Sequence, residues 1–236
     1  MKIQRQRVLI VLLIALIFSG CAGKALYKAR TDFVDSSVMT ARLDIPFQWA
    51  WIKRGVDWKQ YTDLYVAEVN TSYLAIADDW WQEAARYGKI EEDVAEIAGF
   101  TRRAFIEAFQ KDRNRRFRIV QHPSEYGVVL ELAITEVTPN KPLLKAAGIT
   151  ARIANQSNKS TVSFEARVRD GRTNEVIAMF ADREAEKSSL INIKHATWYS
   201  HVHSIVKEWA KQCVAIANKR PREIIKDSSG FDLKPW

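Results

Sequence analysis

The sequence lacks the features that mark membrane-spanning proteins and two common kinds of catalytic site. Its N-terminal apolar run, Val8–Phe18, holds eleven residues, which as a helix at ~1.5 Å per residue reach only ~17 Å, against the ~30 Å core of a bilayer. The Gly-x-Ser-x-Gly pattern of serine hydrolases and the glycine-rich loops that bind phosphate are also absent. These absences exclude a comfortable membrane span by this run and exclude both kinds of site.

Histidine is scarce, and the four histidines do not predict a metal site. His201 and His203 are two residues apart, about 200° around a helix, so they cannot bind one ion from the same helix. His195 lies near the start of that helix, and His122 precedes a proline in a turn. No cysteine or acidic residue stands beside them at the spacing of a zinc site. We therefore expect surface or half-buried histidines, no metal and no cofactor.

The composition is that of a folded globular protein. Hydrophobic residues make up 47% and charged residues 27% of the 236, with ordinary glycine and proline, which predicts one domain with tails. The net charge of +8 includes three basic residues in the first 20. Without them a modest basic excess remains, which an ordinary solvated surface can carry and which could also attract anionic lipid or lipopolysaccharide.

The N-terminus has the three parts of a secretory signal peptide. Lys2, Arg5 and Arg7 precede the apolar run Val8–Phe18, and the small pair Ser19–Gly20 follows it. The order basic, apolar, small is typical of an export signal. Residues 1–20 are therefore predicted to be a signal peptide.

The residue after the small pair indicates how the exported protein is processed. Phe18-Ser19-Gly20-Cys21 resembles a bacterial lipobox, in which the cysteine sulfur receives diacylglycerol and the amine exposed by cleavage receives a further acyl chain such as palmitate. Two or three chains anchor a protein firmly, whereas one chain does not. Phe18 stands where leucine is usual. An ordinary signal-peptidase cut and a buried core helix are the alternatives.

A lipidated Cys21 has two further consequences. Ala22 is not the aspartate that retains Gram-negative lipoproteins at the inner membrane, so the outer membrane, facing the periplasm, is the expected location. Cys213 would be the remaining cysteine, so no internal disulfide is possible even in the oxidising periplasm.

Residues 21–51 are predicted to be a lipid-anchored tether, because they show no sustained helical or strand period. As a flexible coil this segment would span roughly 30 Å. Within it, Pro46–Trp51 alternates like an edge strand. Its aromatic residues are expected to dock on the domain or, alternatively, to lie at the membrane interface. The globular domain is predicted over residues 52–218, with a C-terminal tail over 219–236.

The periodicity predicts an α+β domain. Residues 128–137 and 161–169 alternate with period two, and Asp170–Thr173 turns the chain into a third strand at 175–181. Helical spacing runs from Ile90 to Ala108 and from Ile193 to Asn218. We expect a two-layer fold in which a mostly antiparallel meander sheet is covered on one face by two main helices. Polar residues alternate on the other face, which is expected to meet water.

Two stretches resemble a known family. They are Arg54-Gly55-Val56-Asp57-Trp58-Lys59-Gln60-Tyr61 and the hairpin at 162–176, which contains Val168-Arg169-Asp170-Gly171-Arg172-Thr173. Together they are similar to uncharacterised Gram-negative lipoproteins of domain-of-unknown-function family 3313, over roughly Ile52 to Asn218. The Trp80–Tyr87 segment is longer than this resemblance implies. The family brings no catalytic residues to carry over.

Other candidate residues have structural explanations. Cys213 lies in the apolar stripe of its helix, where a free cysteine behaves as a small hydrophobe rather than a nucleophile. Asp182, Glu184 and Glu186 alternate with basic residues, which favours a solvated charged loop over acid–base chemistry. The basic cluster Lys111–Arg118 is expected to be a solvated helix end or a contact for anionic glycan or lipid. Export makes nucleic acid an improbable partner.

The functional expectation is an outer-membrane-anchored periplasmic lipoprotein whose domain is a non-enzymatic binding or assembly module of the cell envelope. Its partners would be the membrane, through Cys21, and an envelope protein, anionic lipid or glycan. One alternative is an envelope hydrolase or glycan-binding enzyme without a recognisable motif. Another is a lipid-carrying auxiliary of a transport system, which requires an apolar cavity between sheet and helices.

Overall fold

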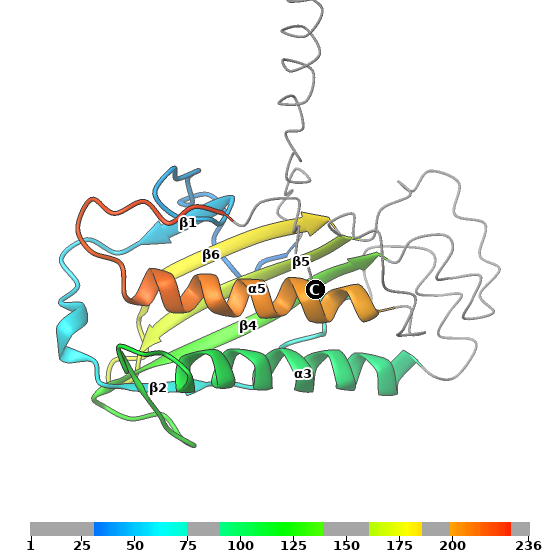
Figure 1. The fold of residues 1–236 in the computed structure, drawn as a ribbon, viewed down its shortest axis with the longest axis horizontal. Coiled ribbons are helices and arrows are strands. Elements are labelled where there is room, and N and C mark those ends of the chain that lie inside the picture. Colours follow the sequence, from blue (N-terminus) through cyan, green and yellow to red (C-terminus); the bar gives the residue numbers. More distant parts are fainter. Residues whose placement is uncertain (1–30, 75–89, 139–160, 186–198, 228–236) are drawn as a thin grey trace, which may run out of the picture.

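The computed structural model describes residues 31–74, 90–138, 161–185 and 199–227. A six-stranded sheet forms its centre, with strand order β1-β6-β5-β4-β2-β3. Two long helices, α3 and α5, lie side by side across one face of the sheet (Figure 1). Cys21, Trp80–Tyr87, Glu186 and His195, on which expectations were stated above, lie outside the described residues.

The predicted α+β fold is confirmed, and most of its principal elements lie within a few residues of their expected bounds. The expected start of the last helix, Ile193, lies outside the described residues. In chain order the elements are β1 (Trp49–Ile52), the 3-10 turn η1 (Trp58–Gln60), β2 (Asp63–Val66), α3 (Ile90–Gln110), β3 (Arg118–Ile119), β4 (Gly127–Thr138), β5 (Thr161–Asp170), β6 (Val176–Ala185) and α5 (Ser200–Ala217).

The strands β4, β5 and β6 form the expected antiparallel meander. At the predicted turn between β5 and β6, Oδ1 of Asp170 accepts hydrogen bonds from the backbone N–H groups of Arg172 and Thr173, both at 2.8 Å. Asn174 closes the turn with a left-handed φ of 59°. A side chain at Gly171 would place Cβ 2.1 Å from the carbonyl oxygen of Ser124, so the turn requires glycine there.

The strand β2 departs from the meander, because it pairs in parallel with both β4 and β3. Helix α3 lies between β2 and these two strands in the sequence. A crossover of this length returns the chain to the same end of the sheet, which is the usual way to make parallel neighbours. The sheet is therefore mixed, with its parallel part at one edge.

Helices α3 and α5 bury their apolar stripes against one face of the sheet. Ile97 and Phe105 of α3 and Trp209 of α5 are fully buried there. The ring of Trp209 lies 4.3 Å from that of Phe164 in β5, measured between centroids, and Phe47 packs edge-on against the same Phe164 ring. Aromatic packing of this kind fills the centre of the layer between helices and sheet.

The opposite face of the sheet differs from the prediction, because a segment of the chain covers part of it and shields that part from water. Phe33, Val34 and Met39 cover it and pack with Ala133 and Met179 of the strands. These three side chains belong to the segment predicted as a tether, so the tether prediction is wrong for residues 31–51. Their irregular spacing gives no periodic signal, yet folding them against the sheet removes apolar surface from water.

The strand-like alternation of Pro46–Trp51 is confirmed as an edge strand docked on the domain. Strand β1 pairs antiparallel with β6, and Phe47 is 2% exposed. Thr40 bridges to Ala50 on the outer side of β1 through two hydrogen bonds of 3.0 Å. No helix in the described ranges is both long enough and apolar enough to cross a bilayer.

Candidate functional site

A cavity of about 360 Å³ opens between the sheet and the C-terminal ends of the two helices. These two helix ends lie at the same end of the molecule, where the chain leaves α5 toward residue 227 (Figure 1). Pockets that hold small organic ligands have volumes from about 300 Å³ upward. The cavity is therefore large enough for such a ligand.

The floor and roof of the cavity are apolar. Leu64, Leu130, Val168 and Ala178 form the floor, one from each of β2, β4, β5 and β6. The roof is contributed by α3 and α5. Its members are Phe109, Cys213, Ile216 and Ala217. These apolar surfaces favour contact with an apolar group of a ligand.

Small side chains explain why space remains at this end of the layer. Ala178 in the floor and Cys213 and Ala217 in the roof replace the large side chains that fill the layer around Trp209 and Phe164. Because the helix backbones are held at one distance from the sheet by those aromatics, the smaller residues beyond them cannot close the gap.

One side of the cavity carries an ion-pair network. Nε and Nη2 of Arg42 each lie 2.8 Å from a carboxylate oxygen of Asp44, and Nζ of Lys219 lies 3.1 Å from Oδ2 of the same group. The hydrogen bonds from Arg42, followed by those from Lys219, lower the pKa of Asp44 despite its partial burial. Asp44 is the single carboxylate among the described residues that line the cavity, and it is doubly paired.

Two further cations line the cavity, Arg116 and Arg220. Nη1 of Arg116 donates to the carbonyl oxygen of Tyr61 at 2.9 Å, Nη2 donates to that of Trp58, and the guanidinium lies 4.2 Å from the centre of the Phe117 ring. Burial lowers the pKa of Arg116. Within the described ranges neither Arg116 nor Arg220 forms an ion pair with a carboxylate.

The members of the predicted basic cluster Lys111–Arg118 lie in different environments in the structure. It follows α3 rather than ending it, and Arg116 is the member that lines the cavity. Lys111 pairs with Glu107, and Arg118 binds both carboxylate oxygens of Asp63 at 3.0 Å. Sequence spacing could not indicate which basic side chain turns inward, because the loop has no regular period.

Cys213 behaves as predicted in part: it is a half-buried member of the apolar stripe of α5 and packs against the core. Burial raises the pKa of its thiol, so the thiolate needed for nucleophilic attack is disfavoured. Its place in the cavity wall was not anticipated.

The prediction of a solvated charged loop at Asp182 is wrong. Strand β6 continues to Ala185, and Asp182 is fully buried, accepting hydrogen bonds from Nε1 of Trp209 at 3.0 Å and the backbone N–H of Gln48 at 3.1 Å. Glu184 is half-buried on the same strand. The carboxylate of Asp182 thus holds α5 and residue 48 to the sheet.

Two other paired carboxylates, the buried Glu136 and the half-buried Glu131, lie on the opposite face of the sheet, away from the cavity. Nε and Nη2 of Arg183 lie 2.8 Å from the two carboxylate oxygens of Glu136. Glu131 binds Arg167 and Arg169. These pairs neutralise charges that sequence alternation had assigned to a wet surface.

The histidines occupy separate places. His122 is exposed in its turn, His201 is buried on α5, and the ring of His203 stacks on Phe100 with centroids 3.8 Å apart. His201 is therefore more deeply buried than predicted. Among the described residues, no three histidine, cysteine or acidic side chains are grouped so that they could hold a metal ion.

Comparison with known proteins gives one family and several distant structures. The family described as "Protein of unknown function (DUF3313)" matches residues 31–213. None of the curated protein sequences matches the chain.

The solved structures that resemble this fold share little sequence with it. A PelC dodecamer from Paraburkholderia phytofirmans is 10% identical, with 72% of this chain and 98% of that chain covered and a TM-score of 0.39. A Xanthomonas campestris protein of family-model DUF330 is 10% identical, with coverages of 71% and 92% and a TM-score of 0.39. A lipoprotein from Neisseria meningitidis is 16% identical, with coverages of 67% and 99% and a TM-score of 0.23.

Proposed function

The chain belongs to the DUF3313 family of proteins of unknown function, and we propose that it is a periplasm-facing lipoprotein of the outer membrane whose domain binds a small ligand without catalysing a reaction. The observation that carries the proposal is the cavity of about 360 Å³ between the sheet and the helix ends, with its apolar floor and roof. Such concave, mostly apolar sites with a few polar groups are where proteins usually hold small molecules.

The arrangement of carboxylates supports binding rather than catalysis. A glycosidase or similar hydrolase needs two carboxyl groups facing one substrate bond. The described cavity wall offers Asp44 alone, held by Arg42 and Lys219. The buried Asp182 is committed to hydrogen bonds with Trp209 and the backbone of Gln48.

The anchor is supported by the sequence around Cys21. Ten residue steps separate Cys21 from Thr31, the first described residue, so the connection spans at most about 35 Å when extended. As a flexible coil these ten residues would span roughly 17 Å, about half the reach expected of residues 21–51, because segment 31–51 is folded on the domain. A lipid on Cys21 would therefore keep the domain close to the membrane surface.

Metabolic labelling with an alkyne-bearing palmitate tests the anchor. Wild type and the matched control Cys213→Ser are expected to carry the label, whereas Cys21→Ser is not. Globomycin, which blocks cleavage after the sulfur has received diacylglycerol, is expected to leave wild type as a labelled, uncleaved precursor. Ala22→Asp is expected to move the labelled protein from the outer-membrane to the inner-membrane fraction. Label retained by Cys21→Ser, or absent from wild type, would contradict the proposal.

A lipid-carrying auxiliary of a transport system is the more specific form of this function that the cavity favours. That role requires an apolar cavity between sheet and helices, and the cavity lies in this place. The chemistry of its wall narrows the choice of ligand further.

A further inference from the structure

Two arginines line the cavity, Arg116 half-buried and Arg220 exposed, and neither guanidinium forms an ion pair with a described carboxylate. Arg116 donates to the carbonyl oxygens of Tyr61 and Trp58, and neither acceptor carries a full charge. Arg220 also lines the cavity. Arg220 is exposed to solvent, so the cost of burial falls on Arg116. A half-buried cation without a carboxylate partner is unfavourable, so an anion at this place would stabilise the site.

Neither arginine is needed as the partner of the cavity's carboxylate, and Arg220 is not needed to cap α5. Asp44 is paired with Arg42 and Lys219, which leaves no carboxylate in the described cavity wall for the arginines. The end of α5 is capped by the backbone N–H groups of Asn218 and Lys219, which donate to the carbonyl oxygens of Val214 and Ile216 at 3.1 Å. Arg220 is therefore not needed to cap the helix.

The rest of the cavity excludes a purely polar anion. Its floor and roof are formed by side chains such as Leu130, Phe109 and Ile216, which a hydrated ion would leave in contact with water. A purely apolar molecule would cover these side chains but leave the half-buried Arg116 without a counter-ion. A molecule with an apolar chain and an anionic head matches both parts of the wall.

We propose that the cavity binds a single-chain amphiphile, with its acyl chain against the apolar floor and roof and its anionic head group on Arg116 and Arg220. This inference rests on the proposed binding function and names its ligand class. A fatty acid and a lysophospholipid both supply this chemistry, through a carboxylate or a phosphate.

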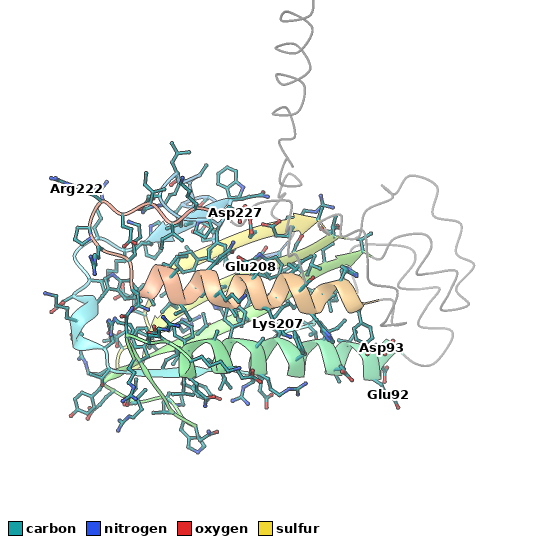
Figure 2. All side chains as sticks on the ribbon, in the orientation of Figure 1. Glu92, Asp93, Lys207, Glu208, Arg222 and Asp227 are labelled. Carbon is teal, nitrogen blue, oxygen red and sulfur yellow. The ribbon has the colours of Figure 1, made fainter. Side chains whose placement is uncertain are left out.

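The cavity mouth fits a ligand that comes from a membrane. Leu43 is 95% exposed and Ile224 is 62% exposed, and their segments are joined by the hydrogen bond from the Ile225 N–H to the Asp44 carbonyl oxygen, at 3.1 Å. Arg222 lies at this same end of the molecule, while Glu92 and Asp93 lie at the other (Figure 2). Exposed apolar residues beside cations are typical of surfaces that contact anionic lipid.

Photo-crosslinking in detergent-free lysates of cells producing the full chain tests the inference. Three probes of one chain length, each with a diazirine and an alkyne, differ in the head group: carboxylate, phosphate or hydroxyl. The carboxylate or the phosphate probe is expected to reach half-maximal labelling at a concentration about tenfold lower than the alcohol, because charge-assisted hydrogen bonds form with the arginines. Whichever acid labels at the lower concentration identifies the source of the head group.

Matched variants assign the effect to the cavity. Arg116→Gln and Arg220→Gln are each expected to reduce the preference for the acid probes, and Arg116→Lys and Arg220→Lys to retain most of it. Arg113→Gln, at an exposed position of the same basic cluster, should leave the preference unchanged. Ala217→Trp should block labelling by every probe, whereas Ala215→Trp, two residues away on the same helix and outside the cavity wall, should not.

The outcomes separate the two proposals. Equal labelling by acid and alcohol probes, with adducts on cavity residues, would overturn the anionic head group and leave the binding function standing. Loss of preference in Arg113→Gln as large as that in Arg116→Gln would also overturn it. Absence of adducts on cavity residues with every probe would overturn both proposals.

Discussion

The phenolic oxygen of Tyr61 lies 2.7 Å from Oδ2 of Asp170, and its O–H donates to that carboxylate. The bond joins the two stretches on which the family resemblance rests, residues 54–61 and 162–176. Each stretch also contributes a side chain to the cavity wall, Trp58 from the first and Val168 from the second. Each of the two stretches that mark the family thus borders the candidate site.

The Tyr61–Asp170 bond predicts a specific dependence on alkaline pH. Burial, followed by the hydrogen bond to Asp170, raises the pKa of Tyr61 from 10.0 to about 12. Because the folded-state pKa is the higher one, the stabilisation is complete below pH 10 and is lost as the pH rises toward 12. Tyr61→Phe should lower the free energy of unfolding at neutral pH by about 1.5–3 kcal/mol.

Urea denaturation of both proteins across this range provides the measurement. The difference in the free energy of unfolding between wild type and Tyr61→Phe should narrow by about 2 kcal/mol between pH 10 and pH 12. A difference that stays constant over this range would show that the phenol does not titrate as the structure requires.

Substitution by alanine is expected to have opposite effects on stability at two glycines, Gly171 in the hairpin turn and Gly99 in α3. Gly171→Ala would place Cβ 2.1 Å from the Ser124 carbonyl oxygen, and rigid backbone cannot easily move away, so a loss of about 2–4 kcal/mol is expected. Gly99→Ala in α3 meets only the flexible end of Arg103, at 3.1 Å, and should gain up to about 1 kcal/mol from helix propensity. Thermal unfolding of the two variants measures whether stability falls in Gly171→Ala and rises in Gly99→Ala. Equal changes in stability would count against the tight turn.

The cover formed by residues 31–51 predicts that this segment stabilises the fold. Phe33 is buried, and the guanidinium of Arg167 lies 4.2 Å from its ring centre. Phe33→Ala should therefore cost about 3–5 kcal/mol. Leu43→Ala, in the same segment but exposed, should stay within about 0.5 kcal/mol of wild type. If both substitutions are neutral in chemical denaturation, the segment is a tether after all.

The ion pair between Arg183 and Glu136 predicts that the stability losses from substituting its two members are not additive. Arg183→Gln removes the double hydrogen bond to Glu136, which is 3% exposed, and should cost about 3–5 kcal/mol. Glu136→Gln combined with Arg183→Gln should cost less, because no buried charge then loses its partner. A double-mutant cycle by urea denaturation measures the coupling, and simple additivity would contradict the arrangement.

The sequence predicted the regular elements because each carries a period. The helix from Ile90 and the alternating strands at 128–137 and 161–169 were all found near their expected bounds. In contrast, Phe33 and Met39 cover the sheet from an irregular segment, and no spacing rule signals that contact. Asp182 was misplaced for a related reason: its charge suggested solvent, while its partners come from α5 and from residue 48, far away in the sequence.

The cavity could not be predicted from sequence at all. It depends on small residues from different layers, such as Ala178 in β6 and Ala217 in α5, lying opposite one another. Local patterns do not encode which side chains meet across two layers. Arg116 was noticed only as one of several basic residues, since its inward direction follows from the loop after α3.

Alkylation of Cys213 tests most directly whether the cavity is the ligand site. With the Cys21 sulfur bonded to lipid, Cys213 is the one thiol left in a chain with two cysteines, and it lies in the cavity roof. At one fixed pH, a saturating fatty acid or fatty alcohol should slow its alkylation by a small maleimide at least about tenfold, and Ala217→Trp should slow it without ligand. An alkylation rate that neither compound changes would contradict the account.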